Sequence, residues 1–153
     1  MKQTPNAGRA TGQLSRALVV TPAALAVVLA SLAGTAPIAR AADTGAQVKP
    51  VFAGKLPNVP GKTLTAVVVN YAPGARSVKH HHAGSVFVYV LSGTIRSENS
   101  ATGPAREYQA GETFFEPPGS EHLVSENAST TEPASLLAVV VADDGAVLTT
   151  VDK

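Results

Sequence analysis

Three histidines, His80, His82 and His122, are the residues of this chain best suited to chemistry. His80 and His82 stand two positions apart, and residues with this spacing on a strand project from the same face. All four histidines of the chain fall in two short stretches, residues 80–82 and 122. Neutral imidazole binds Zn, Fe, Ni, Cu or Mn, and three protein ligands leave room for water or substrate. The pattern therefore indicates one divalent-metal site of the catalytic kind.

The neighbours of these histidines can be assigned to faces by the same alternation. Val86 and Val88 share the parity of His80 and His82, so we expect them beside the site as core or pocket lining. His81 has the opposite parity and is expected at the surface or the rim, as are Phe87, Tyr89 and Leu91. The alternative interpretation is that the three histidines only pack or donate hydrogen bonds, without a metal.

A second stretch, residues 111–122, supplies two further candidates. Phe114 is expected in the core and, second to that, in the pocket wall. Glu116 precedes a Pro-Pro-Gly bend and has the parity of Phe114. It is a weak candidate for an inward-facing general base, and a carboxylate at the barrel rim explains it equally well.

Short β-branched segments separated by turn residues predict an all-β fold, a barrel or sandwich, for residues 60–153. No window after residue 40 has a helical period. Residues 42–59, which contain Pro50 and Pro57, are expected to form an extension with at most a short edge strand near Val51 and Phe52. The apolar run 135–142 is expected to be buried on both faces, and Asp144-Gly145 to join it in a hairpin to residues 147–151.

The two histidine stretches resemble the two sequence motifs of the cupin superfamily. The first motif, Gly-x5-His-x-His-x3-Glu-x6-Gly, is matched by Gly74, His80, His82 and Gly93; the second, Gly-x5-Pro-x-Gly-x2-His-x3-Asn, by Gly111, Pro117, Gly119 and His122. Two positions depart from the pattern. The metal-binding glutamate of the first motif falls on Val86, and the asparagine of the second falls on Glu126, with Asn127 one residue late.

The resemblance implies a single cupin-type, jelly-roll-like β-barrel with a metal-capable pocket formed by His80, His82 and His122. The metal would be Fe, Zn, Mn or Ni, and a three-histidine face is similar to the iron centre of some cupin dioxygenases. Loss of the glutamate would make the site more positive and favour a small organic anion. A metal-dependent lyase or isomerase, and a non-enzymatic barrel that binds a metal or small ligand, are the alternatives. The resemblance and the apolar outer residues together predict a homodimer.

Residues 1–41 have the layout of a secretory signal peptide. A basic start is followed by an uncharged, largely apolar stretch, residues 17–39, and by Ala39-Arg40-Ala41, which suits a signal peptidase. A membrane anchor is the alternative, but Pro22, Gly34 and Pro37 shorten the apolar part. The prediction is an exported protein, periplasmic or secreted, that begins at Ala42 and keeps no stable membrane insertion.

Charge and cysteine content exclude some kinds of binding partner and some kinds of site. The four basic residues before Ala42 leave eight basic against eleven acidic residues in the rest, a net charge of −3. This balance argues against nucleic acid as a partner, since nucleic-acid binding needs a basic surface. The chain contains no cysteine, which excludes disulfides, thiol nucleophiles and cysteine-metal sites.

Overall fold

The computed structural model describes residues 45–153, and all the named elements in this range are β-strands. The expected signal peptide, residues 1–41, lies outside the described residues. No helix within 45–153 is long and apolar enough to cross a membrane. The strands are β1 (Ala46–Lys55), β2 (Lys62–Tyr71), β3 (His80–His82), β4 (Ser85–Ser92), β5 (Thr94–Asn99), β6 (Gly103–Gln109), β7 (Thr113–Glu116), β8 (Glu121–Asn127), β9 (Ala134–Asp143) and β10 (Thr149–Val151).

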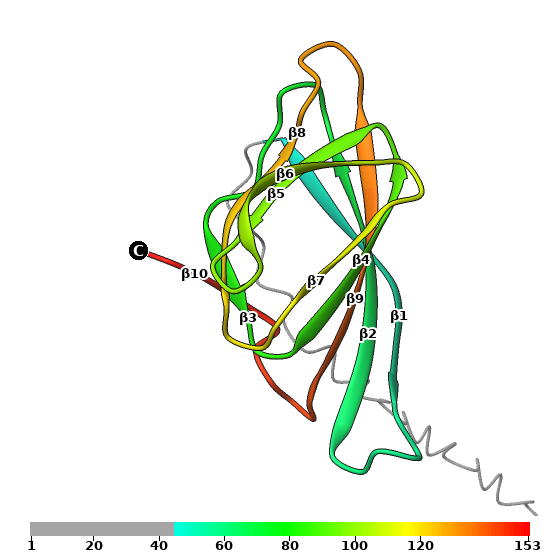
Figure 1. Ribbon diagram of the computed structural model, residues 1–153. Helices are drawn as coiled ribbons and strands as arrows, with labels where there is room; N and C mark the ends of the chain where they lie inside the picture. The colour runs from blue at the N-terminus through cyan, green and yellow to red at the C-terminus, as the bar shows by residue number, and fades with distance from the viewer. Residues whose placement is uncertain (1–44) are drawn as a thin grey trace, which may run out of the picture. The chain divides into compact units, whose positions relative to one another are not determined.

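The strands form two five-stranded sheets, with orders β1-β2-β9-β4-β7 and β10-β3-β8-β5-β6. All their named pairings are antiparallel. The two sheets face each other, and Figure 1 shows them enclosing an interior between β9 and β4 on one side and β8 and β3 on the other. The all-β fold predicted from the turn spacing is confirmed.

Alternating side chains build the core between the sheets. In β4, Val86, Val88 and Val90 are almost fully buried, whereas Phe87, Tyr89 and Leu91 are exposed by 40% or more. The register of β4 on β9 places Val86 opposite Val140 and Val90 opposite Leu136, so the inward rows of the two strands meet in one layer. β-Branched side chains suit this position because they pack well on a pleated, half-buried surface.

The run 135–142 forms the central strand of its sheet, but the prediction that it is buried on both faces is wrong. Its inward residues, such as Leu136 and Val140, are buried, and its outward residues Leu137, Val139 and Val141 are only half-buried. In the part of the chain that the structure describes, no second layer covers the outer face of this sheet, because the other sheet packs on the inner face only.

The prediction of at most a short strand near Val51 and Phe52 is also wrong, since β1 is ten residues long and pairs with β2 along its length. Pro50 is tolerated because β1 is an edge strand and because the register shifts between Pro50 and Phe52. Proline cannot donate to a ladder, but edges and bulges do not require that donor.

Two connections cross between the sheets where the sequence suggested continuity. His80 and His82 lie on β3 in one sheet and Val86 on β4 in the other, so the common strand face assumed for all three is wrong. The turn at Asp144-Gly145 likewise leads from β9 to β10 in the opposite sheet, where β10 pairs with β3. The predicted hairpin is therefore absent from residues 135–151.

The motif glycines mark backbone positions that other residues adopt poorly. Gly74, Gly93, Gly111 and Gly119 have φ values of 68°, 69°, 92° and 72°, in the left-handed region. At Gly93 a side chain would in addition meet the carbonyl oxygen of Pro133 at 2.7 Å. These glycines explain the spacing of both motifs in terms of turns that flank the site strands.

Candidate metal centre

The short strand β3 brings the three histidines together. It pairs with β8 so that His80 lies directly opposite His122, and with β10 so that His82 lies opposite Thr149. The imidazole centroids of His80 and His82 are 4.8 Å apart, and those of His80 and His122 are 5.0 Å apart. One nitrogen from each of the three rings can be chosen so that all lie within 4.8 Å of one another. The predicted cluster of His80, His82 and His122 is therefore present.

Two of the rings are oriented by the backbone. The Nδ1 atom of His80 lies 2.7 Å from the carbonyl oxygen of Val78, and that of His82 lies 3.0 Å from the carbonyl oxygen of Leu148. A carbonyl only accepts, so each Nδ1 carries the proton and each Nε2 keeps a lone pair. This tautomer is the one required of a metal ligand that binds through Nε2.

His122 is held from the other side. Its Nε2 lies 2.9 Å from the hydroxyl oxygen of Ser97, which is buried on β5. A serine hydroxyl can donate or accept, so it accommodates either tautomer of this ring. When Ser97 accepts from Nε2, the Nδ1 atom of His122 has a free lone pair that faces the cluster. Ser97 was not among the residues predicted from the sequence.

Glu116 is the fourth polar residue of the cluster. It lies at the end of β7, directly opposite Val86 on β4, and only 2% of it is exposed. Its Oε2 atom is 3.2 Å from Nδ1 of His122 and 3.9 Å from Nε2 of His82. The sequence left open whether Glu116 faces inward or lies at the barrel rim, and in the structure it faces inward. The charge that Val86 fails to supply is therefore present at the neighbouring position.

Burial sets the protonation of the cluster. Removal from water lowers the pKa of His80 to about 4 despite the bond to Val78, and burial likewise lowers the pKa of His82. Burial opposes ionisation of Glu116, but contact with His122 and the charges of the three histidines outweigh it and leave its pKa below the usual value. At neutral pH the site therefore presents two neutral imidazoles and a carboxylate.

The cluster fits a divalent metal by one further observation. Within residues 45–153, the buried atoms Glu116 Oε2 and His122 Nδ1 have no hydrogen-bond partner of acceptable geometry, although they are 3.2 Å apart. Buried polar atoms are normally satisfied. A cation between them and the two Nε2 atoms would satisfy both, and imidazole with carboxylate is a donor set common to Zn, Fe and Mn.

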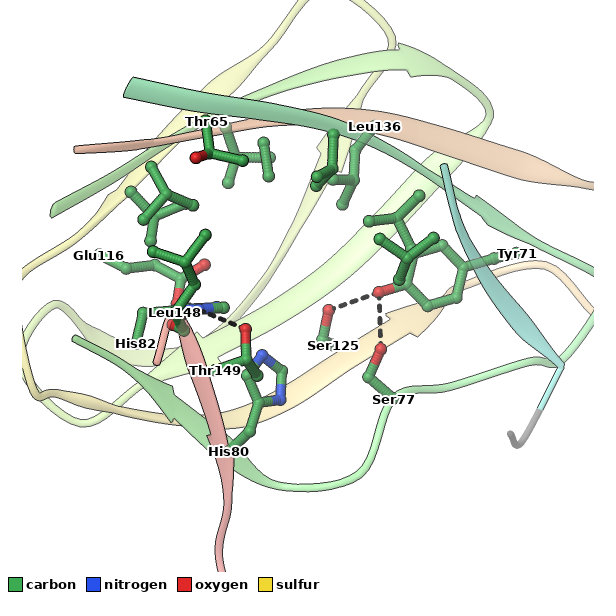
Figure 2. Close-up of a pocket in the computed structure, with 17 residues that line it drawn as sticks. Thr65, Tyr71, Ser77, His80, His82, Glu116, Ser125, Leu136, Leu148 and Thr149 are labelled. Atoms are coloured by element: carbon green, nitrogen blue, oxygen red, sulfur yellow. Dashed lines mark hydrogen bonds and ion pairs between the residues drawn. The ribbon is translucent and has the colours of Figure 1, made fainter. Parts of the chain in front are cut away.

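His80, His82 and Glu116 line a largely apolar cavity of about 90 Å³, whereas His122 is not among its lining residues. Figure 2 shows His82 and Glu116 at one end of this cavity, and the hydroxyl group of Tyr71 with Ser77 and Ser125 at the other. The Tyr71 hydroxyl oxygen is 2.8 Å from Oγ of Ser125 and 3.0 Å from Oγ of Ser77, and burial raises the pKa of Tyr71. Aliphatic side chains line the space between the ends: Val67, Val69, Val88, Leu136, Ala138 and Val140.

The other residues singled out in the sequence take different positions. Val86 and Val88 line the cavity. Phe114 does not lie among the lining residues; it packs with Tyr108 at a ring distance of 4.7 Å and with His122 at 6.2 Å. His81 points away from the cluster, with its Nδ1 atom 2.7 Å from Asp152 Oδ1. The hydroxyl group of Tyr71 was missed, although Tyr71 ends a strand with inward alternation.

Sequence comparison agrees with the geometry. The cupin domain family matches residues 67–140, the region that contains both histidine motifs. The chain belongs to the cupin superfamily. No curated protein matches the sequence of this cupin.

Solved structures with the same fold are distant in sequence. An oxalate oxidase in complex with the substrate analogue glycolate superposes with a TM-score of 0.55 at 21% identity, covering 71% of this cupin and 56% of that chain. An uncharacterised double-stranded β-helix protein from Klebsiella pneumoniae superposes with a TM-score of 0.56 at 21% identity, covering 76% of this cupin and 91% of that chain. The DMSP lyase DddQ from Ruegeria pomeroyi superposes with a TM-score of 0.50 at 22% identity, covering 57% of this cupin and 42% of that chain. This cupin thus spans about half the length of the oxidase and lyase chains, and the likeness shows the fold.

The low pKa of His80 predicts how the metal-free protein responds to acid. The pKa of His80 is about 4 in the folded protein and 6.5 in the unfolded chain. Between these two pH values the unfolded chain therefore binds more protons than the folded protein. The free energy of unfolding consequently falls as the pH falls from 6.5 to about 4. The lowered pKa of His82 acts in the same direction. The loss from His80 alone is at most about 3 kcal/mol.

Urea unfolding in the presence of a chelator, from about pH 7 to about pH 4.5, measures this loss. His80→Asn should make the pH dependence shallower, because the substituted side chain does not titrate. A wild-type stability that is constant across this range would contradict a buried, neutral His80.

Proposed function

We propose that this cupin is an exported metal-dependent enzyme, of the dioxygenase type, that acts on a small organic anion. The observation that carries the proposal is the convergence of His80, His82 and His122 beside a cavity whose walls are largely aliphatic. Export is supported by the signal-like layout of residues 1–41. A bound iron would supply oxygen chemistry, and a bound Zn, Mn or Ni would supply Lewis acidity.

The residues of the chain have separate tasks in this proposal. His80, His82 and His122 hold the metal, the first two through Nε2 atoms that the backbone bonds to Val78 and Leu148 keep free. The aliphatic wall excludes water from the hydrocarbon part of the substrate. The Tyr71 hydroxyl group, at the far end, is placed to bond to a polar atom of the substrate, with Ser77 and Ser125 fixing its position.

The comparisons support enzymatic chemistry but not one reaction. One neighbour is named an oxalate oxidase and is bound to glycolate, and another is named a DMSP lyase. Both names describe those proteins, and they motivate tests of an oxidase-like and a lyase-like reaction here. The alternative to an enzyme is a barrel that holds a metal or a small ligand without turnover.

Reconstitution with iron should separate these functions. Metal-free protein loaded anaerobically with Fe(II) and mixed with short-chain carboxylates of differing length should consume oxygen with at least one of them. His82→Ala should weaken iron binding and lower oxygen uptake together, because it removes one of the three imidazole ligands. His81→Ala is the matched control and should retain both, since that ring points away from the site.

Product formation without oxygen uptake, measured on the same samples, would replace the dioxygenase with a lyase or isomerase. Metal binding without any turnover would favour the alternative function, a barrel that holds a metal or a small ligand. Failure of the wild type to bind iron, zinc, nickel or manganese after dialysis would overturn the metalloenzyme altogether.

We further propose that two copies pair through the outer face of the β1-β2-β9-β4-β7 sheet. The register places exposed Phe87 between Phe115 on β7 and Val139 on β9, and exposed Tyr89 beside Leu137. Phe87, Tyr89, Leu91 and Phe115 are each exposed by 40–48%. A contiguous apolar surface of this kind is typical of a protein interface.

Light scattering at micromolar concentration should give the mass of a dimer. Leu91→Glu should shift it to the mass of one chain, because a charge buried in the interface is unpaired. Val147→Glu changes an exposed apolar residue outside this sheet and should leave the dimer intact. A wild-type monomer would contradict the proposed pairing.

A further inference from the structure

We propose that Glu116 is the fourth metal ligand of this cupin, and that it supplies from β7 the carboxylate that the motif pattern would place at Val86 on β4. The inference rests on the proposed metal site. It adds a residue that the motif pattern does not predict, and it changes the expected donor set from three nitrogens to three nitrogens and one oxygen.

The pairing of β4 with β7 makes this exchange geometrically simple. Val86 and Glu116 are directly opposite each other in the ladder. Opposite residues of an antiparallel pair have Cβ atoms about 4.5–5.5 Å apart on the same face. Both are almost fully buried, with 1% and 2% exposure, and both line the cavity. A carboxylate on either position therefore starts close to the same point and can reach the same neighbours.

The position of the carboxylate oxygen favours a ligand over other roles. Glu116 Oε2 lies between two imidazoles, 3.2 Å from His122 Nδ1 and 3.9 Å from His82 Nε2. These separations are those of donor atoms around one cation with bonds of about 2.1 Å. A residue that only oriented His122 would form a proper hydrogen bond with it, yet within the described residues Oε2 and Nδ1 are both buried without one.

A carboxylate ligand alters which metal the site prefers. Carboxylate oxygen suits Mn and, together with imidazole, Fe(II), whereas imidazole alone suits Zn, Cu and Ni. The charge of Glu116 also reduces that of a bound divalent ion by one unit. The excess positive charge that the loss of the motif glutamate suggested is therefore cancelled, and a substrate anion meets a site of net charge about +1.

The relocation can be tested by moving the carboxylate back. We would titrate the metal-free protein with Mn²⁺ and with Zn²⁺ and compare wild type, Glu116→Gln, Glu116→Val and the double variant Val86→Glu/Glu116→Val. Glu116→Gln should weaken Mn²⁺ binding by more than about 100-fold, beyond the 10–100-fold typical of a lost supporting partner, and Zn²⁺ binding by less. The double variant should recover most of the Mn²⁺ affinity lost in Glu116→Val.

Glu121→Gln is the matched control. It removes the same charge next to His122 in the chain, but Glu121 is exposed and paired with Lys79 at 3.2 Å, so both affinities should remain at the wild-type level. Circular dichroism of each metal-free variant checks that the fold is intact.

Equal losses of Mn²⁺ and Zn²⁺ affinity in Glu116→Gln, no larger than about 100-fold, would show that Glu116 only supports His122 and would overturn the inference while leaving the metal site. A double variant as weak as Glu116→Val would overturn the positional exchange. If wild type bound neither ion, the proposed metal function itself would fail, and this result is distinct from the two variant results above.

Discussion

The pairing of β3 with strands on both of its sides determines where the imidazoles lie. This strand has only three residues, His80–His82, and it could not hold a conformation alone. The β8 neighbour places His122 opposite His80, and the β10 neighbour brings the Leu148 carbonyl group to His82. The site therefore depends on residues 148–151, far along the chain from the histidines, as much as on the motif that contains them.

Electrostatics and packing act together at this strand. Burial keeps His80 and His82 neutral, and their backbone bonds select the tautomer with a free Nε2. Glu116 adds a negative charge between His82 and His122, and aliphatic residues line the middle of the cavity. In such a poorly hydrated interior an unpaired charge is costly, so a cation bound to the cluster would stabilise the fold as well as provide chemistry.

The local spacing of turn residues predicted the all-β fold, and the resemblance of two separate stretches to the cupin motifs predicted the three-histidine cluster. Turn residues at short intervals indicate strands, and the intervals around Gly74, Gly93, Gly111 and Gly119 locate the turns that have positive φ. Long-range pairing is different. That β10 joins β3 and not β9, and that Glu116 lies opposite Val86, follow from the arrangement of strands in the two sheets. Alternation within one strand carries no information about either.

The assumption of a continuous face from His80 to Val86 shows the limit of parity arguments. The chain changes sheets at Ala83-Gly84, and a side chain at Gly84 would meet the carbonyl oxygen of Val141. Val86 nevertheless lines the cavity, because both sheets direct one face inward. The sequence correctly predicted that Val86 lies beside the site. The physical reason is that two sheets close around one interior, and not that one strand presents a continuous face.

The proposed metal centre consists of four side chains of this interior that together hold one divalent cation. Anomalous diffraction from crystals grown with Mn²⁺ tests it most directly. One strong peak is expected, about 2.1 Å from a nitrogen of each of His80, His82 and His122 and from an oxygen of Glu116. A map without a peak at this position, in crystals where the four side chains are well ordered, would contradict it.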